Sequence, residues 1–322
     1  MRRSQSWLRL IIATFVSLIL WDASAEDQKK QICSWQPERS RSGPILIIVN
    51  IDDQVAFVYR NGIQIGQTPV STGRPGYPTP TGVFSILGKD ANHHSKKYNN
   101  AAMPYAERLT WSGIFLHAGD LPGYPSSHGC VHLPLAFAKD LFDTTQPHDT
   151  TVVITESTSH PTEAGPIEQL LRIVEPNASA TQKPNNVLWE PNRSKDGSVA
   201  IVISGLDKRI EILRGGVLIG QAPISLAEPE TSLPEALYVK LQPSPGKPSP
   251  DWSAVLIAGS QTTSPSHLLG EIQIPAPISN ELNKLLVPGT LLITTPGSLT
   301  PDNRSATNFV GVQASAGATP NP

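Results

Sequence analysis

The chain has 322 residues, of which 39% are hydrophobic, 6% aromatic and 16% charged, and its formal net charge at pH 7 is −2. This length accommodates two domains of ordinary size, each with a hydrophobic core. The near balance of acidic and basic residues argues against a nucleic-acid partner and against an anionic membrane surface as partner.

The first 25 residues predict a secretory signal peptide. Three arginines flank the start of an uncharged run over residues 10–21, and Ala23-Ser24-Ala25 supplies a small-residue cleavage site. A membrane anchor is the alternative, but it needs about 20 apolar residues. We therefore expect a secreted protein of the periplasm or cell envelope, with no transmembrane span after removal of the signal.

The chain contains two cysteines, Cys33 and Cys130. Both remain after signal removal and enter an oxidising compartment, where a disulfide between them is one possibility. The other is that Cys33 is a small buried apolar residue and that Cys130 keeps a free thiol. We favour the second, because a disulfide would consume the thiol that the motif below singles out.

A pattern of strands and turns occurs twice in the chain. Residues 45–71 align with residues 199–225 at a constant offset of 154 residues. Asn61-Gly62 and Gly215-Gly216 are hairpin signals between β-rich runs, so each copy predicts strand, turn, strand, turn, strand. The sequence thus predicts an internal repeat.

Further matches follow at a smaller offset of 141 residues. They pair residues 111–116 with 252–257 and residues 131–134 with 272–275, so the second copy is shorter in its middle. The missing part corresponds to residues 90–105, a polar stretch that we expect to form a loop over the site. After each match at 131–134 and 272–275 we expect a short helix and then a last strand.

The candidate catalytic residues lie between residues 117 and 130. His117 precedes Ser127-His128-Gly129-Cys130. An imidazole and a thiol that meet across a loop form a base–nucleophile pair, and a glycine lets backbone amides approach a reacting carbonyl. The pattern therefore favours Cys130 as a catalytic nucleophile. In the second copy Glu271 aligns with Cys130, and no histidine aligns with His128.

A zinc site is the other chemical interpretation of these residues. Imidazole and thiolate are zinc ligands, so His117, His128, Cys130 and His132 could together hold the metal of a hydrolase. Their spacing is irregular and no second cysteine pair is present. We therefore favour the thiol enzyme and expect no cofactor or metal.

Three ordered matches carry a resemblance to a known family. The first is His117 through Ser-His-Gly-Cys with the hydrophobic Val131 after it, the second is Pro-Thr-Pro-Thr-Gly-Val-Phe at residues 78–84, and the third runs from residues 103–105 to 111–113. Together they resemble the L,D-transpeptidases of the YkuD family. His132 departs from the family, which more often has Arg or Asn there, so its role stays open.

The resemblance covers residues 44–156 closely and residues 198–295 weakly, and it implies a mainly β fold with short helices, duplicated in tandem. The expected organisation is a signal peptide (1–25), an N-terminal segment (26–43), a catalytic domain (44–156), a linker (157–197), a degenerate transpeptidase-like domain (198–295) and a disordered tail (296–322).

The resemblance also implies a reaction. Cys130 would attack a carbonyl of a peptidoglycan stem peptide, release the terminal D-alanine and pass the acyl group to a second stem peptide, to water or to an envelope protein. A non-catalytic peptidoglycan-binding protein is the alternative. The implied roles are: catalytic, Cys130, His117 and His128; oxyanion binding or orientation, Gly129, Ser127 and Ala118, whose carbonyl would hold His117; and substrate binding, His132, Tyr105 and Met103.

Overall fold

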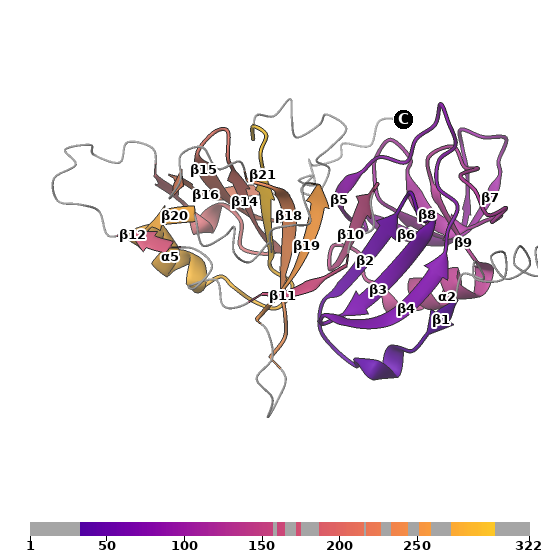
Figure 1. Cartoon of the computed structure of the whole chain (residues 1–322), viewed down its shortest axis with the longest axis horizontal. Coiled ribbons are helices and arrows are strands. Elements are labelled where there is room, and N and C mark those ends of the chain that lie inside the picture. Colours follow the sequence, from indigo (N-terminus) through magenta and orange to yellow (C-terminus); the bar gives the residue numbers. More distant parts are fainter. Residues whose placement is uncertain are drawn as a thin grey trace, which may run out of the picture. The chain divides into compact units, whose positions relative to one another are not determined.

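The computed structural model describes residues 33–156, 160–164, 172–174, 187–215, 217–226, 233–243, 251–258 and 272–299 (Figure 1). The predicted signal peptide lies outside these residues. So do Glu271 and residues 300–322 of the predicted tail.

The described residues form mainly strands, with short helices, as predicted. The elements up to residue 156 are β1 (Ser34–Trp35), the 3₁₀ helix η2 (Pro37–Arg39), β2 (Ile45–Asn50), β3 (Val55–Arg60), β4 (Ile63–Pro69), β5 (Gly82–Ser85), β6 (Gly88–His94), β7 (Ala102–Arg108), β8 (Phe115–Ala118), β9 (Val131–Leu133), α2 (Leu135–Thr144) and β10 (Thr150–Thr155).

The later elements are β11 (Thr162–Ala164), β12 (Arg172–Val174), β13 (Leu188–Trp189), the 3₁₀ helix η3 (Pro191–Arg193), β14 (Val199–Ser204), β15 (Arg209–Arg214), β16 (Val217–Pro223), β17 (Ser225–Leu226), β18 (Glu235–Lys240), β19 (Trp252–Ala258), β20 (Ile272–Pro275), α5 (Ala276–Asn283) and β21 (Leu291–Thr295). Among the described residues, no helix is long and apolar enough to cross a membrane.

The first half is built on a six-stranded sheet of order β1-β4-β3-β2-β10-β5. Its central strands β2 and β10 pair in parallel, and every residue of both is buried. Alternate side chains of β2 point to opposite faces: Ile47 packs in a cluster with Phe137 and Leu141 of α2, whereas Ile48 packs in another cluster. Both faces of this sheet are therefore covered, which explains the continuous apolar run in its sequence.

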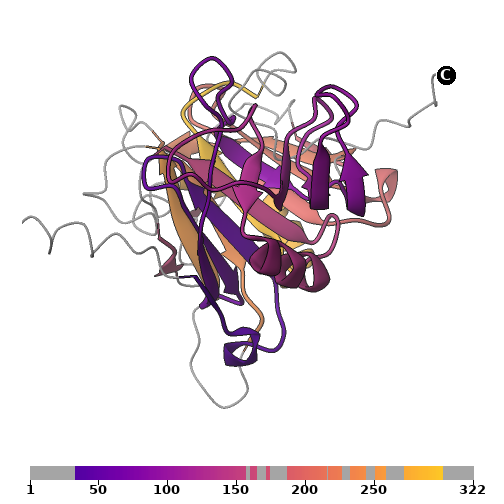
Figure 2. The same ribbon diagram turned by 90° about the vertical axis from the view of Figure 1, so that its right-hand side faces the viewer.

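A second sheet of the first half, of order β6-β7-β8-β9, carries the candidate chemistry (Figure 2). Its first two strands form a hairpin that pairs from Gly88 with Arg108 to His94 with Ala102. The prediction of a loop over residues 90–105 is therefore wrong. Strand pairing uses backbone groups, so a partly exposed hairpin can carry the polar side chains that suggested a loop.

The second half repeats the order of the first sheet. Its eight-stranded sheet runs β11-β19-β18-β21-β14-β15-β16-β13, and the six strands from β18 to β13 match β5 to β1 in order and pairing direction. A register shift falls between Val58 and Tyr59 in β3 and between Ile212 and Leu213 in β15. These positions are related by the offset of 154 residues found in the sequence.

The same offset also relates side-chain contacts to residues that precede each copy of the predicted repeat. The guanidinium of Arg60 donates to the Ser40 carbonyl at 3.0 Å, and that of Arg214 donates to the Ser194 carbonyl at 3.1 Å. A Cβ atom added at Gly66 would lie 2.7 Å from the Trp35 ring, and one added at Gly220 would lie 2.7 Å from the Trp189 ring. The equivalent elements therefore begin at β1 and at β13, inside the segments assigned to the N-terminal segment and the linker.

The two halves differ beside the strand that precedes each helix. β9 pairs in parallel with β8, whereas β20 pairs in parallel with β12. Residues 252–257, which align in sequence with residues 111–116, belong to β19 and pair with β18 in the large sheet. The sequence match therefore does not extend to strand pairing here. Residues 172–174, which lie in the predicted linker, form the strand β12.

The outer face of the first sheet packs against residues of the second half. One apolar cluster contains Ile48, Phe57 and Val153 together with Leu237 and Ile293. The hydroxyl of Thr155 donates to the Ile257 carbonyl at 3.1 Å beside it.

The described start of the predicted disordered tail is packed in the same cluster. Leu299 is 4% exposed, and its amide donates to the Asp207 carboxylate at 2.6 Å. The expectation of disorder is therefore wrong for residues 296–299.

Candidate active site

The register of β8 and β9 places the candidate residues on one face of the smaller sheet. Leu116 pairs with Val131, and both side chains are in the apolar core. Because side chains alternate along a strand, His117 on β8 and Cys130, just before β9, project to the opposite face. Neighbouring strands are about 4.8 Å apart, so this register brings the imidazole and the thiol to the same patch.

Cys130 is partly buried on an apolar floor. It packs against Met103, Ala106 and Phe115, and its Sγ lies 3.7 Å from the Gly113 carbonyl. Burial raises the pKa of the Cys130 thiol, against the smaller opposite effect of a hydrogen bond from the Phe115 amide. Cys130 is therefore a thiol, not a thiolate, at neutral pH.

His117 is 6% exposed, and its Nδ1 lies 2.8 Å from the Ala118 carbonyl oxygen. The carbonyl can only accept, so Nδ1 donates and Nε2 is left as a proton acceptor. This is the hydrogen bond that the resemblance implied. Burial, and to a smaller extent the nearby His132, lower the pKa of His117 to about 4. The imidazole is therefore neutral at pH 7.

Ser127 fixes the turn before Cys130. Its buried hydroxyl donates to the Cys130 carbonyl at 2.6 Å and accepts from the Gly129 amide at 3.0 Å. Gly129 has a φ of +107°, which favours glycine, and an added Cβ would lie 2.9 Å from Ile114. The Gly129 amide is engaged in this turn, so the Cys130 amide is the better oxyanion donor.

His128 lies on the exposed side of the turn. Its Nε2 is 2.7 Å from a guanidinium nitrogen of Arg74, and its ring contacts Tyr77 and Tyr98 at centroid distances of 4.8 and 4.4 Å. Because guanidinium can only donate, His128 accepts through Nε2. The partners of His128 are thus different from those of His117, whose ring lies 4.8 Å from that of His132.

The three predicted substrate contacts have different surroundings. His132 touches the His117 ring, and its Nδ1 lies 3.0 Å from the Asp120 carbonyl. Met103 forms part of the floor beneath Cys130. Tyr105 lies in a gap of the β6–β7 pairing with a φ of +55°, and its ring turns to Phe142 of α2. Tyr105 therefore packs on the core side, away from the face of Cys130.

The partners of His128 were not predicted from the sequence. Arg74, Tyr77 and Tyr98 come from the loop before β5 and from the β6–β7 turn, and no spacing in the sequence links these loops. The cysteine expectation was half right: Cys33 and Cys130 are both free, but Cys33 is exposed and not buried. Cys33 stands next to the edge strand β1, where little of the protein covers it.

No group of three or more His, Cys, Asp or Glu residues in the described part of the chain is arranged to hold a metal ion. The zinc interpretation of His117, His128, Cys130 and His132 therefore gains no support from their geometry.

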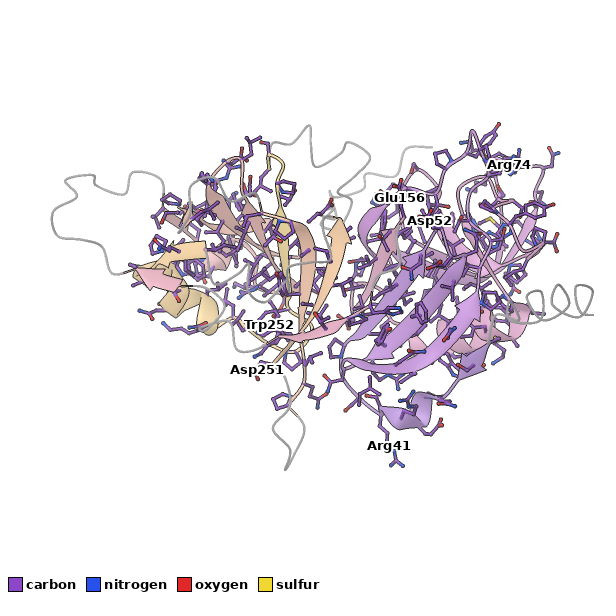
Figure 3. The ribbon with its side chains drawn as sticks, in the orientation of Figure 1. Arg41, Asp52, Arg74, Glu156, Asp251 and Trp252 are labelled. Atoms are coloured by element: carbon purple, nitrogen blue, oxygen red, sulfur yellow. The ribbon has the colours of Figure 1, made fainter. Side chains whose placement is uncertain are left out.

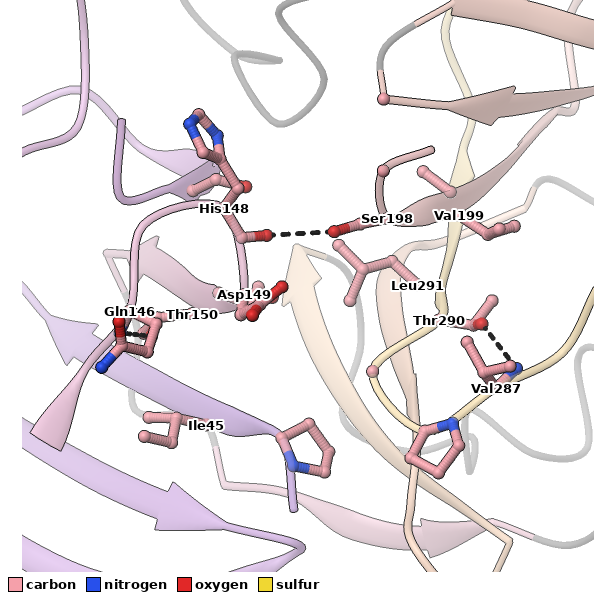
Figure 4. A pocket seen from close by; sticks show the side chains of 18 of the residues that line it. Ile45, Gln146, His148, Asp149, Thr150, Ser198, Val199, Val287, Thr290 and Leu291 are labelled. Atoms are coloured by element: carbon pink, nitrogen blue, oxygen red, sulfur yellow. Dashed lines mark hydrogen bonds between the residues drawn. The ribbon is translucent and has the colours of Figure 1, made fainter. Parts of the chain in front are cut away.

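A pocket of about 1200 Å³ lies elsewhere (Figure 4). It is lined by residues of both halves, including Ile45, His148 and Leu291, and the Ser198 hydroxyl donates across it to the His148 carbonyl at 3.1 Å. Neither Cys130 nor His117 lines it, so it is separate from the candidate active site.

Comparison with known proteins finds similarity in the first half. Residues 44–154 match the family model of the L,D-transpeptidase catalytic domain, YkuD. L,D-transpeptidase 1 of Mycobacterium tuberculosis is 32% identical over 124 residues, which are 33% of this chain and 49% of that protein. The chain thus spans about half the length of the curated relatives it matches.

Solved structures of L,D-transpeptidases also align with part of the chain. One from Mycobacterium smegmatis is 24% identical with a TM-score of 0.33, covering 35% of this chain and 59% of its own. One from Stackebrandtia nassauensis is 28% identical with a TM-score of 0.31, covering 39% and 60%.

Proposed function

We propose that residues 44–154, which match the L,D-transpeptidase catalytic-domain family, make this protein an L,D-transpeptidase that acts on peptidoglycan stem peptides. The observation that carries the proposal is the placement of His117 and Cys130 on one face of neighbouring strands, with His117 Nδ1 tied to the Ala118 carbonyl. That bond leaves Nε2 of a neutral imidazole free to take a proton.

The proposed acylation starts from a neutral pair. Because His117 has a pKa of about 4 and burial raises that of Cys130, an imidazolium–thiolate pair is not the resting state. His117 would take the thiol proton as Sγ attacks the carbonyl that precedes the terminal D-alanine. A carbon–sulfur bond forms, and the Cys130 amide stabilises the oxyanion. The carbon–nitrogen bond then breaks, and the imidazolium returns the proton to the departing amine.

The acyl-enzyme would then meet an acceptor. An amine of a second stem peptide gives a cross-link, water gives a shortened stem, and an amino group of an envelope protein gives an anchored protein. In each case His117, neutral again, removes a proton from the attacking group. The proposed location is the periplasm or cell envelope, reached through the signal peptide of residues 1–25.

We further propose that residues 198–295 are a degenerate copy of the domain that supports the first half. The shared strand order, the equivalent bonds of Arg60 and Arg214, and the packing of Trp35 and Trp189 support common origin. Support for the first half follows from the apolar cluster that both halves build.

Tetrapeptide muropeptides test the catalytic proposal. The purified protein should release D-alanine from them and form dimers or tripeptides, which chromatography and mass spectrometry separate. Cys130→Ala should fold, as judged by circular dichroism, and release none. Continued D-alanine release by Cys130→Ala would contradict the proposal. Binding without turnover by the wild-type protein would favour the non-catalytic alternative.

A further inference from the structure

A polar and aromatic cluster surrounds His128 beside the nucleophile. Arg74 lies in the loop before β5 (Figure 3), Tyr98 in the β6–β7 turn, and His128 two residues before Cys130. The Arg74 guanidinium lies 2.7 Å from His128 Nε2 and 4.8 Å from the centre of the Tyr77 ring. Three separate loops therefore meet at this point, which we call the His128 cluster: Arg74, Tyr77, Lys97, Tyr98 and His128.

Among the residues that the structure describes, the positive charge of the His128 cluster has no acidic ion-pair partner. Lys97 lies 5.5 Å from the centre of the Tyr98 ring. Desolvation of the ring, followed by the charges of Arg74, His132 and Lys97 in that order, lowers the pKa of His128. His128 is therefore a neutral acceptor for the Arg74 guanidinium.

The guanidinium of Arg74 has more N–H donors than His128 can accept from. It has five N–H groups in a planar fork, and Nε2 of His128, the one acceptor nitrogen of a neutral imidazole, takes one of them at 2.7 Å. The contacts with His128 and Tyr77 hold the plane in place, so little side-chain entropy remains to be lost when it binds a ligand. A planar fork of this kind matches a carboxylate.

We propose that Arg74, assisted by Lys97, binds the C-terminal carboxylate of the donor stem peptide and so selects chain ends as donors. The inference rests on the proposed transpeptidase function. The carboxylate carbon of the leaving residue is three bonds from the scissile carbonyl carbon. The α-carbon of His128 is at most about 7.6 Å from that of Cys130, because consecutive α-carbons are 3.8 Å apart. Arg74 is thus hydrogen-bonded to a residue whose α-carbon lies within about 7.6 Å of that of the nucleophile, which places a carboxylate-binding group beside it.

Two tetrapeptide donors test the proposal, one with a free C-terminal carboxylate and one with a carboxamide. Arg74→Gln should lower kcat/KM for the free carboxylate by about 10- to 100-fold, mainly through KM, since charge-assisted hydrogen bonds are lost. The wild-type protein should show a similar loss with the carboxamide, and Arg74→Gln should then lose little more. Lys97→Gln should give a smaller loss in the same direction.

Matched control variants distinguish the loss of the Arg74 or Lys97 charge from a general effect of removing a positive charge or of disturbing the active site. Arg39→Gln removes the same charge from η2, at the β1 edge of the larger sheet, and Lys96→Gln removes it from the residue next to Lys97; both should retain wild-type kcat/KM. Alkylation of Cys130 by neutral iodoacetamide should proceed at the wild-type rate in Arg74→Gln, which shows that the nucleophile is intact.

Equal losses by Arg74→Gln on both donors, or equal use of both donors by the wild-type protein, would overturn the carboxylate site while leaving the transpeptidase proposal in place. If the wild-type protein turns over neither donor, the transpeptidase proposal itself fails. Calorimetric binding of the free-carboxylate tetrapeptide to Cys130→Ala then decides. Adding Arg74→Gln should weaken that binding at least tenfold, and unchanged or undetectable binding would overturn the site.

Discussion

The two halves of the molecule share an arrangement of six strands, which we call the shared frame: β1, β4, β3, β2, β10 and β5 in the first half and β13, β16, β15, β14, β21 and β18 in the second. They differ in the strands that are added to this frame. Both have a six-strand order with a parallel central pair, the same register shift and the same tryptophan packed on a glycine. In the first half, the four-stranded sheet of β6 to β9 adds His117 and places Cys130. The residues proposed for the reaction therefore lie outside the shared frame, so this frame can form without them.

The difference is sharpest at one backbone position. In the first half His117 pairs with His132, and in the second half Arg172 of β12 pairs with Gln273. The other neighbours stay equivalent, since Ser71 bridges His132 and Ser225 pairs with Gln273. A strand from between the halves thus occupies the place of the strand that carries the proposed base.

Removal of residues 198–322 should have the largest effect. It would expose the apolar face that includes Ile48, Phe57 and Val153, now buried against the second half. Burial of each such side chain is worth about 1.5–3 kcal/mol, so the loss is comparable to the stability of a typical domain, about 5–15 kcal/mol. We expect aggregation in size-exclusion chromatography and no cooperative thermal transition. A soluble, cooperatively folded first half with wild-type turnover would show that the second half is dispensable.

His117→Ala should cost about 10²- to 10⁴-fold in kcat/KM, the usual contribution of a general base. His132→Ala should cost less than about tenfold, because His132 contacts the base but is not proposed to take the proton. Steady-state assays on tetrapeptide donors measure both. Equal losses of kcat/KM in the two variants, or a larger loss for His132→Ala, would contradict the assignment of His117 as the general base.

The pH profile should separate a neutral base from a preformed ion pair. His117 is active when unprotonated, so kcat/KM should fall as pH drops through its pKa of about 4 and should stay level between about pH 5 and 7. His132→Ala should shift this acid limb upward, because His132 lowers the pKa of His117. An acid limb near pH 6.5 in the wild-type protein would contradict the neutral pair.

The shared frame predicts matched stability losses. In Gly66→Ala and Gly220→Ala the new Cβ would approach Trp35 and Trp189 equally closely, so each change should cost about 1–3 kcal/mol in urea unfolding. Gly88→Ala is the control, because an added Cβ there meets nothing within 4 Å. A large loss at Gly66 with none at Gly220 would mean that the two frames are not equivalent.

Local sequence signals predicted local structure well. The hairpin at Asn61-Gly62, the helix after Pro134 and the last strand that follows it, β10, all occur, because turn residues and apolar periodicity act over a few positions. The positions of β12 and β19 were not predictable in this way, since their partners are far along the chain. The repeat upstream of residue 45 was visible as Trp-x-Pro-x-Arg-Ser at residues 35–40 and 189–194, but it precedes the β-rich run.

The site shows the same division. The Ser-His-Gly-Cys motif located Cys130 and the turn fixed by Ser127, because these residues are adjacent in the chain. The core-side packing of Tyr105 was not visible in the sequence, because a left-handed backbone conformation turns its ring to Phe142. Arg74 was missed because only the folding of separate loops brings it to His128.

We expect Cys130, in the first half, to be the nucleophile of this protein. Intact-mass spectrometry after incubation with a carbapenem-type acylating probe tests this assignment most directly. We expect one adduct per chain, located by peptide mapping on the peptide that contains Cys130, and no adduct in Cys130→Ala. An adduct that persists in Cys130→Ala, or one located on Cys33 or in the second half, would contradict it.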